Sequence, residues 1–260
     1  MTAWSTEHAR KTYSIPHWSE GYYDVDDGGR VVVRPLGADG LAVPLPEIVD
    51  KAMERGAKLP LLVRFPDILG DRLRRLQAAF AQAQAESDYT GGYTAVYPIK
   101  VNQHAGVAGT LASHHGEGFG LEAGSKPELL IALALMDTPD ALIICNGFKD
   151  IEYIEMALIS LKMGRNTFIV VDRASELKTI IQAAKRLDIK PRIGFRCKLN
   201  SQAAGRWSES SGAKSKFGLT PSEIVEGVNL LKNEDMLDCL QLLHFHIGSQ
   251  IPSIQAIKSA

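Results

Sequence analysis

From about residue 59 onward, short apolar runs rich in β-branched residues alternate with longer segments whose apolar residues recur with helical spacing. This alternation is typical of βα units around a parallel sheet. It predicts strands at residues 59–65, 92–100, 118–123, 141–146, 167–172, 191–197 and 240–247. Open doubly wound sheets usually have about five or six strands, so seven successive units favour a TIM-type (β/α)8 barrel that is incomplete, with seven of its eight strands.

Residues 1–58 follow a different pattern, in which YYDV and RVVVRP read as two strands separated by the turn DDGG. We therefore expect an N-terminal β segment over 1–58 and a barrel domain over 59–260. The polar stretch 200–216, rich in Ser and Gly, is long for a βα loop and is expected to be a mobile or a ligand-facing loop.

The charge balance argues for a small-molecule partner. The formal net charge is -1, whereas a nucleic-acid or anionic-membrane partner requires an excess of Lys and Arg. No run reaches the ~20 apolar residues of a membrane span, and the start lacks the apolar core of a secretion signal, so we expect a cytoplasmic protein. Cys145, Cys197 and Cys239 are odd in number and widely spaced, which is typical of small buried hydrophobes rather than of disulfides or a metal site.

A single lysine, Lys100, ends the apolar run GYTAVYPIK. The carboxyl ends of barrel strands face the mouth where ligands bind. Counting by twos places Thr94, Val96 and Pro98 on the same face, a wall that would partly desolvate the amine and make it a better nucleophile. Such an amine reacts with aldehydes, pyridoxal phosphate above all. From position alone a solvated lysine is the simpler interpretation, and Pro98 weakens the strand assignment.

Two histidines, His244 and His246, project to one side of the last predicted strand, and Gly248 and Ser249 follow it. Such a pair is a possible zinc site, but the sequence offers no third ligand at a strand end. An interior histidine with satisfied hydrogen bonds is therefore the favoured interpretation of His244. A Gly-Ser turn after a late barrel strand provides N–H groups and a hydroxyl for a phosphate.

The segment GLEAGSKPEL, at 120–129, combines helix-capping residues with one unexplained carboxylate. Ser125 is expected as the N-cap of the next helix, with Pro127 in its first turn and Glu128 completing a capping box. Helix capping does not explain Glu122. A carboxylate at the inward end of a barrel strand is unfavourable unless it is paired with a cation. Lys100 is its expected partner.

Five motifs together resemble the bacterial biosynthetic arginine decarboxylases, members of the alanine-racemase-like, fold type III pyridoxal-phosphate enzymes. The motifs are YPIKVNQ, GLEAGSKPEL, CNGFKD, KSKFG and LLHFHIGSQ. The resemblance implies decarboxylation of L-arginine to agmatine and CO2 in polyamine biosynthesis, with pyridoxal phosphate as the cofactor. It also implies Mg2+ as a second cofactor and a homo-oligomer, a dimer or larger, in the full-length enzyme.

The resemblance also implies roles for residues at matching positions. Lys100 matches the lysine that binds the cofactor covalently, and His246 the histidine that stacks on the pyridine ring. Ser249 matches a hydroxyl near the phosphate, Glu122 the acidic residue beside the lysine, and Arg196 an arginine of the cofactor pocket.

Lys216 matches a flexible active-site loop in relatives, with a solvated lysine as the alternative. Relatives continue beyond the matched region with a glycine-rich phosphate loop, an acidic partner for the pyridine nitrogen, and a cysteine and an aspartate donated across a dimer interface. The resemblance thus implies an N-terminal portion of the enzyme, expected to be inactive alone. Alternative functions are ornithine or diaminopimelate decarboxylase, alanine racemase, a non-catalytic decarboxylase-like regulator, and a metal-dependent hydrolase that uses His244 and His246.

Overall fold

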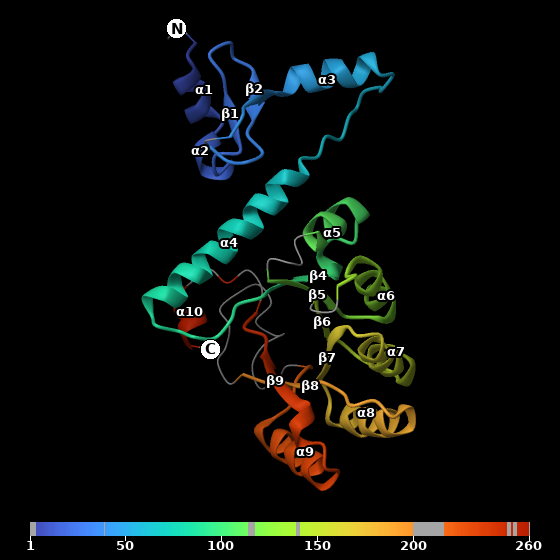
Figure 1. Ribbon diagram of the computed structural model, residues 1–260. Helices are drawn as coiled ribbons and strands as arrows, with labels where there is room; N and C mark the ends of the chain where they lie inside the picture. The colour runs from blue at the N-terminus through green and yellow to red at the C-terminus, as the bar shows by residue number, and fades with distance from the viewer. Residues whose placement is uncertain are drawn as a thin grey trace. The chain divides into compact units, whose positions relative to one another are not determined.

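The computed structural model describes residues 4–38, 40–113, 118–138, 141–199, 216–248, 251 and 254–259. The chain divides into two compact units (Figure 1): Met1–Tyr93 with His104–Leu111, and Thr94–Gln103 with Ala112–Ala260. The predicted division into 1–58 and 59–260 stays a prediction.

The first unit contains a small antiparallel sheet with the strand order β1-β2-β3. Its elements are α1 (Thr6–Thr12), α2 (Ile15–Trp18), β1 (Tyr23–Val25), β2 (Val31–Val33), β3 (Val43–Pro44), α3 (Leu45–Glu54) and α4 (Pro66–Glu86). The pairing of Tyr23 with Val33 and of Val25 with Val31 confirms the hairpin predicted around DDGG. Asp24 on β1 accepts hydrogen bonds from Arg10 and Arg34.

The predicted strand at 59–65 is wrong, because these residues form neither strand nor helix. Leu59 is 64% exposed and Leu62 is 77% exposed, so the apolar run is not buried as a barrel strand would be. Pro60 has no N–H to donate to a strand ladder, and Pro66 begins α4 directly after the run. Six of the seven predicted strands remain.

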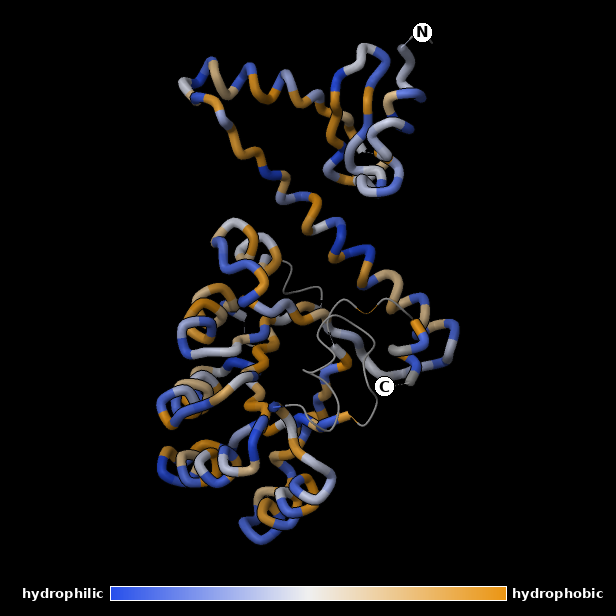
Figure 2. The backbone as a smooth tube through the Cα atoms, turned by 180° about the vertical axis from the view of Figure 1, so that it is seen from behind, coloured by the Kyte–Doolittle hydropathy of each residue, from blue (hydrophilic) through white to orange (hydrophobic). Residues whose placement is uncertain are grey.

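The second unit is built on a parallel sheet whose six strands follow one another in chain order. They are β4 (Ala95–Pro98), β5 (Phe119–Ala123), β6 (Leu142–Cys145), β7 (Asn166–Val171), β8 (Ile193–Cys197) and β9 (Leu240–Phe245). The sheet curls into part of a barrel (Figures 1 and 2). The predicted α/β barrel class is confirmed, with six strands among the described residues rather than seven.

The connecting helices cover the outer, convex face of this sheet. They are α6 (Lys126–Leu135), α7 (Ile151–Lys162), α8 (Ala174–Leu187) and α9 (Pro221–Asn233), all predicted from helical spacing. The remaining elements are η1 (Ile99–Val101), α5 (Ala105–Ala112), η4 (Leu237–Cys239) and α10 (Ile254–Ser259).

The core of this unit lies between the outer face of the sheet and these helices, where orange segments face each other in Figure 2. Fully buried strand residues include Leu121, Ile143 and Ile169, and Ile154 and Ile180 on the helices are equally buried. The strands are therefore anchored from outside, which leaves their inner face for other partners.

Side-chain hydroxyl groups cap the N-termini of α6 and α9. Ser125 accepts from the Glu128 N–H, as predicted, and Thr220 forms a capping box at the start of α9. The capping box predicted at Ser125 is wrong, because the Glu128 carboxylate accepts from the N–H of Gly124 at 2.8 Å rather than from Ser125 itself. The carboxylate thus stabilises the turn that follows β5.

Candidate functional site

The candidate site lies on the inner face of the sheet, toward the carboxyl ends of the strands. Toward the amino ends this face carries an apolar cluster of Ile144, Phe168 and Val170, packed with Val96, Leu142 and Leu242. Side chains return to the same face every second residue, and paired residues of neighbouring strands share a face. Register pairing sets Glu122 opposite Ile144 and Arg196 opposite His244. The inner face therefore continues into a polar layer of Glu122, Asn146, Asp172, Arg196 and His244.

This polar layer holds buried atoms that no described residue satisfies. Glu122 Oε2, Asn146 Oδ1, Asp172 Oδ2 and His244 Nδ1 are all buried without a hydrogen-bond partner. Buried polar groups in proteins are nearly always hydrogen-bonded. The layer therefore indicates a place for polar groups that the described chain itself does not supply.

Glu122 is only 7% exposed. Burial raises the pKa of its carboxyl group, whereas Lys100, a hydrogen bond from the Asn146 side chain, and Arg196 lower it. Burial prevails, so this carboxyl group retains a proton more readily than an exposed one. Lys100, its predicted partner, is one of two cations that act on this carboxyl group, and Arg196 is the other.

Lys100 lies at the mouth of the sheet, but not within a strand. β4 ends at Pro98, and Lys100 belongs to the short 3-10 turn Ile99–Val101. Its side chain is exposed, so the predicted enclosure by Thr94, Val96 and Pro98 is wrong. The turn breaks the two-residue period on which that prediction depended. The Lys100 amine still influences the titration of Glu122 and of both histidines, which places it within electrostatic range of them.

A buried network of four charged residues adjoins the layer. Lys149 Nζ lies 3.7 Å from Asp172 Oδ2 and 3.3 Å from Glu176 Oε2, with its side chain wholly buried. Glu176 accepts from the N–H groups of Lys149 and Asp172, at 3.2 and 2.9 Å. Arg196 donates to Asp172 Oδ1 at 3.1 Å. Two cations and two carboxylates thus balance each other, and the guanidinium is held at the inner face.

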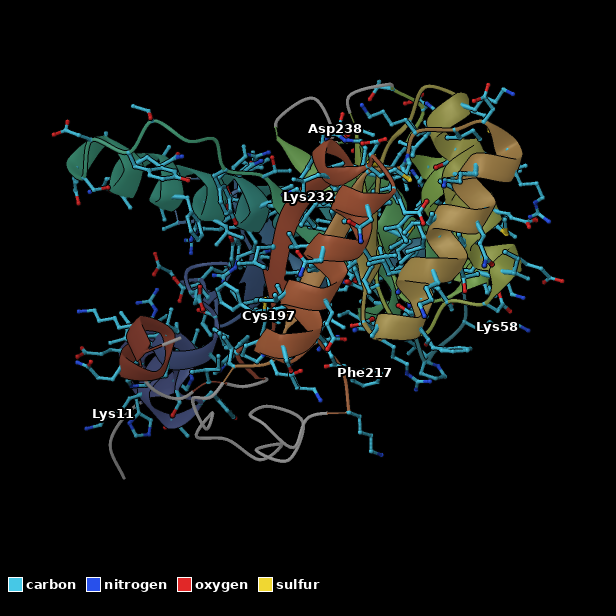
Figure 3. The ribbon with its side chains drawn as sticks, turned by 90° about the horizontal axis from the view of Figure 1, so that it is seen from below. Lys11, Lys58, Cys197, Phe217, Lys232 and Asp238 are labelled. Atoms are coloured by element: carbon cyan, nitrogen blue, oxygen red, sulfur yellow. The ribbon has the colours of Figure 1, made fainter. Side chains whose placement is uncertain are left out.

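The segment 217–219, which precedes α9, contacts Arg196 and Asp172. The Phe217 ring centre lies 5.3 Å from the guanidinium carbon, within cation–π range. The Leu219 N–H donates to the Arg196 carbonyl at 2.6 Å, and the Gly218 N–H to that of Asp172 at 3.1 Å. In Figure 3 Phe217 and Cys197 lie toward one end of the domain, and Asp238, just before β9, toward the other.

The two histidines differ in environment. His244 is half-buried, and burial, Arg196, His246 and Lys100 together lower its pKa to about 4, with Asp172 as the opposing charge. His246 follows the end of β9 and is exposed, and partial desolvation, Arg196 and Lys100 also lower its pKa. The interpretation of His244 as a satisfied interior histidine is wrong, because its Nδ1 has no partner within the described part of the chain.

Other predicted residues are placed only in part. Ser249 and most of the predicted loop, residues 200–215, lie outside the described residues. Lys216 is exposed. Cys145 and Cys239 are buried, as predicted, whereas Cys197 is half-buried at the end of β8. Within the described ranges the cysteines are free thiols.

Four residues of the polar layer and its network were not predicted as site residues: Asn146, Lys149, Asp172 and Glu176. Asn146 and Lys149 belong to CNGFKD, a motif that carried the family resemblance but was given no role. Asp172 directly follows the apolar run TFIVV, and an acidic residue at the end of a predicted barrel strand could have indicated a site residue. Glu176 gave no signal, because an acid in the first turn of a helix is ordinary.

Neither a metal cluster nor a membrane span is found in the part of the chain that the structure describes. No group of three or more His, Cys, Asp or Glu residues there is arranged to hold a metal ion. None of the described helices is both long and apolar enough to cross a bilayer.

A family model described as pyridoxal-dependent decarboxylase, pyridoxal binding domain, matches residues 73–260. The chain belongs to this decarboxylase family. The match covers the whole curled sheet and every residue of the polar layer.

Relatives of this decarboxylase chain carry a more specific name. The chain is 63% identical to a biosynthetic arginine decarboxylase of Xanthomonas campestris, over all of this chain and 41% of that protein. It is 49% identical to one of Gloeobacter violaceus, over 100% of this chain and 40% of that protein. The chain thus spans about two fifths of the length of the curated relatives it matches.

Solved structures agree with the decarboxylase fold. The biosynthetic arginine decarboxylase of Campylobacter jejuni superposes with a TM-score of 0.84 at 37% identity, over 95% of this chain and 39% of that one. A diaminopimelate decarboxylase of M. jannaschii gives a TM-score of 0.66 at 25% identity, over 92% and 51% of the two chains.

The residues of this chain fit pyridoxal phosphate, the cofactor of the family. The cofactor presents an aldehyde, a ring hydroxyl, a ring nitrogen and a phosphate. The exposed Lys100 amine stands at the mouth for the aldehyde. The unpaired atoms of Glu122, Asn146 and His244 offer hydrogen-bond partners beneath it, and the apolar cluster offers a floor for the ring.

Proposed function

We propose that this protein is an arginine decarboxylase that converts L-arginine to agmatine and CO2, a step of polyamine biosynthesis. The observation that carries the proposal is the layer of buried, unpaired polar atoms on the same face as the apolar cluster and within electrostatic range of the Lys100 amine. Such a layer suits a flat, polar cofactor with an aldehyde. The arginine specificity rests on the relatives, which are named biosynthetic arginine decarboxylases.

In this proposal Lys100 holds the cofactor covalently, and His246 lies against its ring. Glu122 and Arg196 line the cofactor pocket, and Ser249 binds near the phosphate. The exposed position of Lys100 suits this role, because the amine must leave its aldehyde partner when the substrate amine arrives.

Pyridoxal phosphate, when bound, supplies the electron sink for the electrons that the departing CO2 leaves behind. The chain contributes orientation and proton handling. Arg196, fixed by Asp172, keeps a positive charge beside the layer. The apolar cluster excludes water below the ring. Lys100 Nζ is the proposed acid that returns a proton to the substrate α-carbon.

The assignment of Lys100 is tested by mapping the cofactor. Treating the protein with pyridoxal phosphate and then borohydride should fix the label on the peptide that contains Lys100. Lys100→Arg keeps the charge but cannot bind the aldehyde productively, so it should abolish turnover and labelling together. Label on the exposed Lys216 instead would overturn the assignment.

The substrate is tested by competition among amino acids. In a longer chain that extends beyond these 260 residues, the protein with cofactor should release CO2 from L-arginine with a higher kcat/KM than from L-ornithine or diaminopimelate. A higher kcat/KM for L-ornithine or diaminopimelate would instead identify the protein as a decarboxylase of that amino acid. Cofactor binding without turnover of any of the three would favour a decarboxylase-like regulator.

Four further predictions made from the sequence and from the family resemblance belong to the same proposal. They are a cytoplasmic location, assembly into a homo-oligomer, a requirement for Mg2+, and inactivity of these 260 residues alone. Cell fractionation, mass measurement in solution, chelation with EDTA, and an agmatine assay of the 260-residue chain beside a longer one test them in turn.

A further inference from the structure

His244 is an unusual residue on the inner face of the sheet. It follows the inward-facing Leu242 by two residues on β9, so the apolar surface of that strand ends in an imidazole. Arg196 lies directly opposite on β8. Nδ1 of this imidazole is buried, yet no described residue bonds to it.

A purely structural role explains this arrangement poorly. A buried histidine kept for packing normally has hydrogen-bond partners, since an unsatisfied polar atom lowers stability and an apolar side chain of similar size would avoid that loss. The same layer leaves Glu122 Oε2 and Asn146 Oδ1 without hydrogen-bond partners. Three such atoms on one face point to a shared polar occupant rather than to an isolated packing defect.

The charges around His244 keep it neutral at physiological pH. Arg196 on β8, His246 beyond the end of β9 and Lys100 after β4 all disfavour a positive imidazole, and Asp172 after β7 is the opposing anion. Burial is the largest cause of the lowered pKa, and it acts in the same direction as these three groups. A neutral imidazole has one donor and one acceptor nitrogen, so Nδ1 remains able to form a hydrogen bond.

We propose that His244 is a binding residue of the site, whose buried Nδ1 forms a hydrogen bond with a polar atom of bound pyridoxal phosphate. This inference rests on the proposed function, because it takes its ligand from that proposal. Arg196, the register partner of His244 on β8, is itself held in place: Asp172 Oδ1 accepts from its guanidinium at 3.1 Å, and the Phe217 ring lies 5.3 Å from its guanidinium carbon.

Two variants separate binding from packing. His244→Leu removes the polar atom and leaves an apolar side chain. His244→Asn keeps an amide near the position of Nδ1. Phe245→Leu, on the outward-facing neighbour, is the matched control. For each variant the melting temperature of the cofactor-free protein and the dissociation constant for pyridoxal phosphate are measured, the latter by absorbance titration.

We expect the substitutions at His244 to change cofactor affinity without lowering the melting temperature. His244→Leu should melt at or above the wild-type temperature and bind pyridoxal phosphate about tenfold more weakly, the usual effect of one lost hydrogen bond. His244→Asn should bind within about threefold of wild type, since a hydrogen bond of similar strength is retained. Phe245→Leu should bind as wild type does.

Two outcomes would overturn the inference. One is equal cofactor affinity in wild type and His244→Leu. The other has two parts. The melting temperature of His244→Leu falls far enough to account for its weaker binding, and His244→Asn binds the cofactor no better than a further variant, His244→Gln. The glutamine amide reaches past the position of Nδ1, so it should not replace the hydrogen bond. Failure of wild type itself to bind pyridoxal phosphate would instead refute the proposed function.

Discussion

Arg196 on β8 and Asp172 at the end of β7 form a 3.1 Å ion pair on the inner face of the sheet, with side chains only 14% and 1% exposed. The pair joins the buried Lys149–Glu176 pair to the polar layer. One carboxylate therefore links the core of the domain to the candidate site.

Asp172→Asn should destabilise the protein strongly. The substitution leaves the buried cations of Lys149 and Arg196 without their shared anion, and breaking a buried pair in this way costs about 3–5 kcal/mol. Urea denaturation measures the free energy of unfolding. Asp238→Asn is the control, because Asp238 pairs with Lys190 at the surface, where water screens the charges. Similar losses in the two variants would contradict the network.

Lys149 and Glu176 should be energetically coupled. Lys149→Met and Glu176→Gln each leave a buried partner uncompensated, whereas the double variant removes both charges. We expect the double variant to be more stable than the sum of the single losses implies, by about 0.5–3 kcal/mol. The same cycle on the exposed Lys126–Glu152 pair should give a smaller coupling, because water screens exposed charges. Additivity at both pairs would contradict a buried network.

His244 should make the protein less stable in mild acid. Burial and then Arg196 lower its pKa to about 4 in the folded state, from 6.5 in the unfolded chain. Between these values the unfolded chain binds more protons, so this contribution to stability is complete above pH 6.5 and is lost as the pH falls toward 4.

The measurement is the free energy of unfolding from pH 7 to pH 4 for wild type and for His244→Leu. Wild type should lose stability faster than the variant, by at most about 1.4 kcal/mol per pH unit. Subtracting the two profiles removes the contribution of the carboxylates. Parallel profiles would show that His244 does not titrate with a lowered pKa.

Gly147 should tolerate no side chain. Its φ of +74° favours glycine, and an added Cβ would lie 2.5 Å from the Gly124 carbonyl oxygen. Gly164 has a similar φ of +82° but nothing within 4 Å, so Gly164→Ala isolates the backbone cost of about 1–2 kcal/mol. Gly147→Ala should lose clearly more stability by urea denaturation. Equal losses would mean that the turn between Asn146 and Lys149 can relax.

The sequence alone determined the order and kind of most elements. Apolar, β-branched runs and helical spacing predicted seven strands and their helices, and six of those strands are present, because these patterns reflect which residues of each element are buried. Local chemistry also predicted the DDGG hairpin and the Ser125 cap, since both depend on residues close in the chain.

Only the tertiary structure decided which apolar run joins the sheet and which residues share the site. Residues 59–65 have strand-like composition, but a strand requires a partner, and composition cannot supply one. Lys149 and Asp172 follow β6 and β7, whereas Arg196 lies within β8. Strand order and register bring them together, so their charges balance only once the sheet has formed. The unpaired Nδ1 of His244 has the same origin, because burial and missing partners are properties of the folded sheet and not of the motif HFHIG.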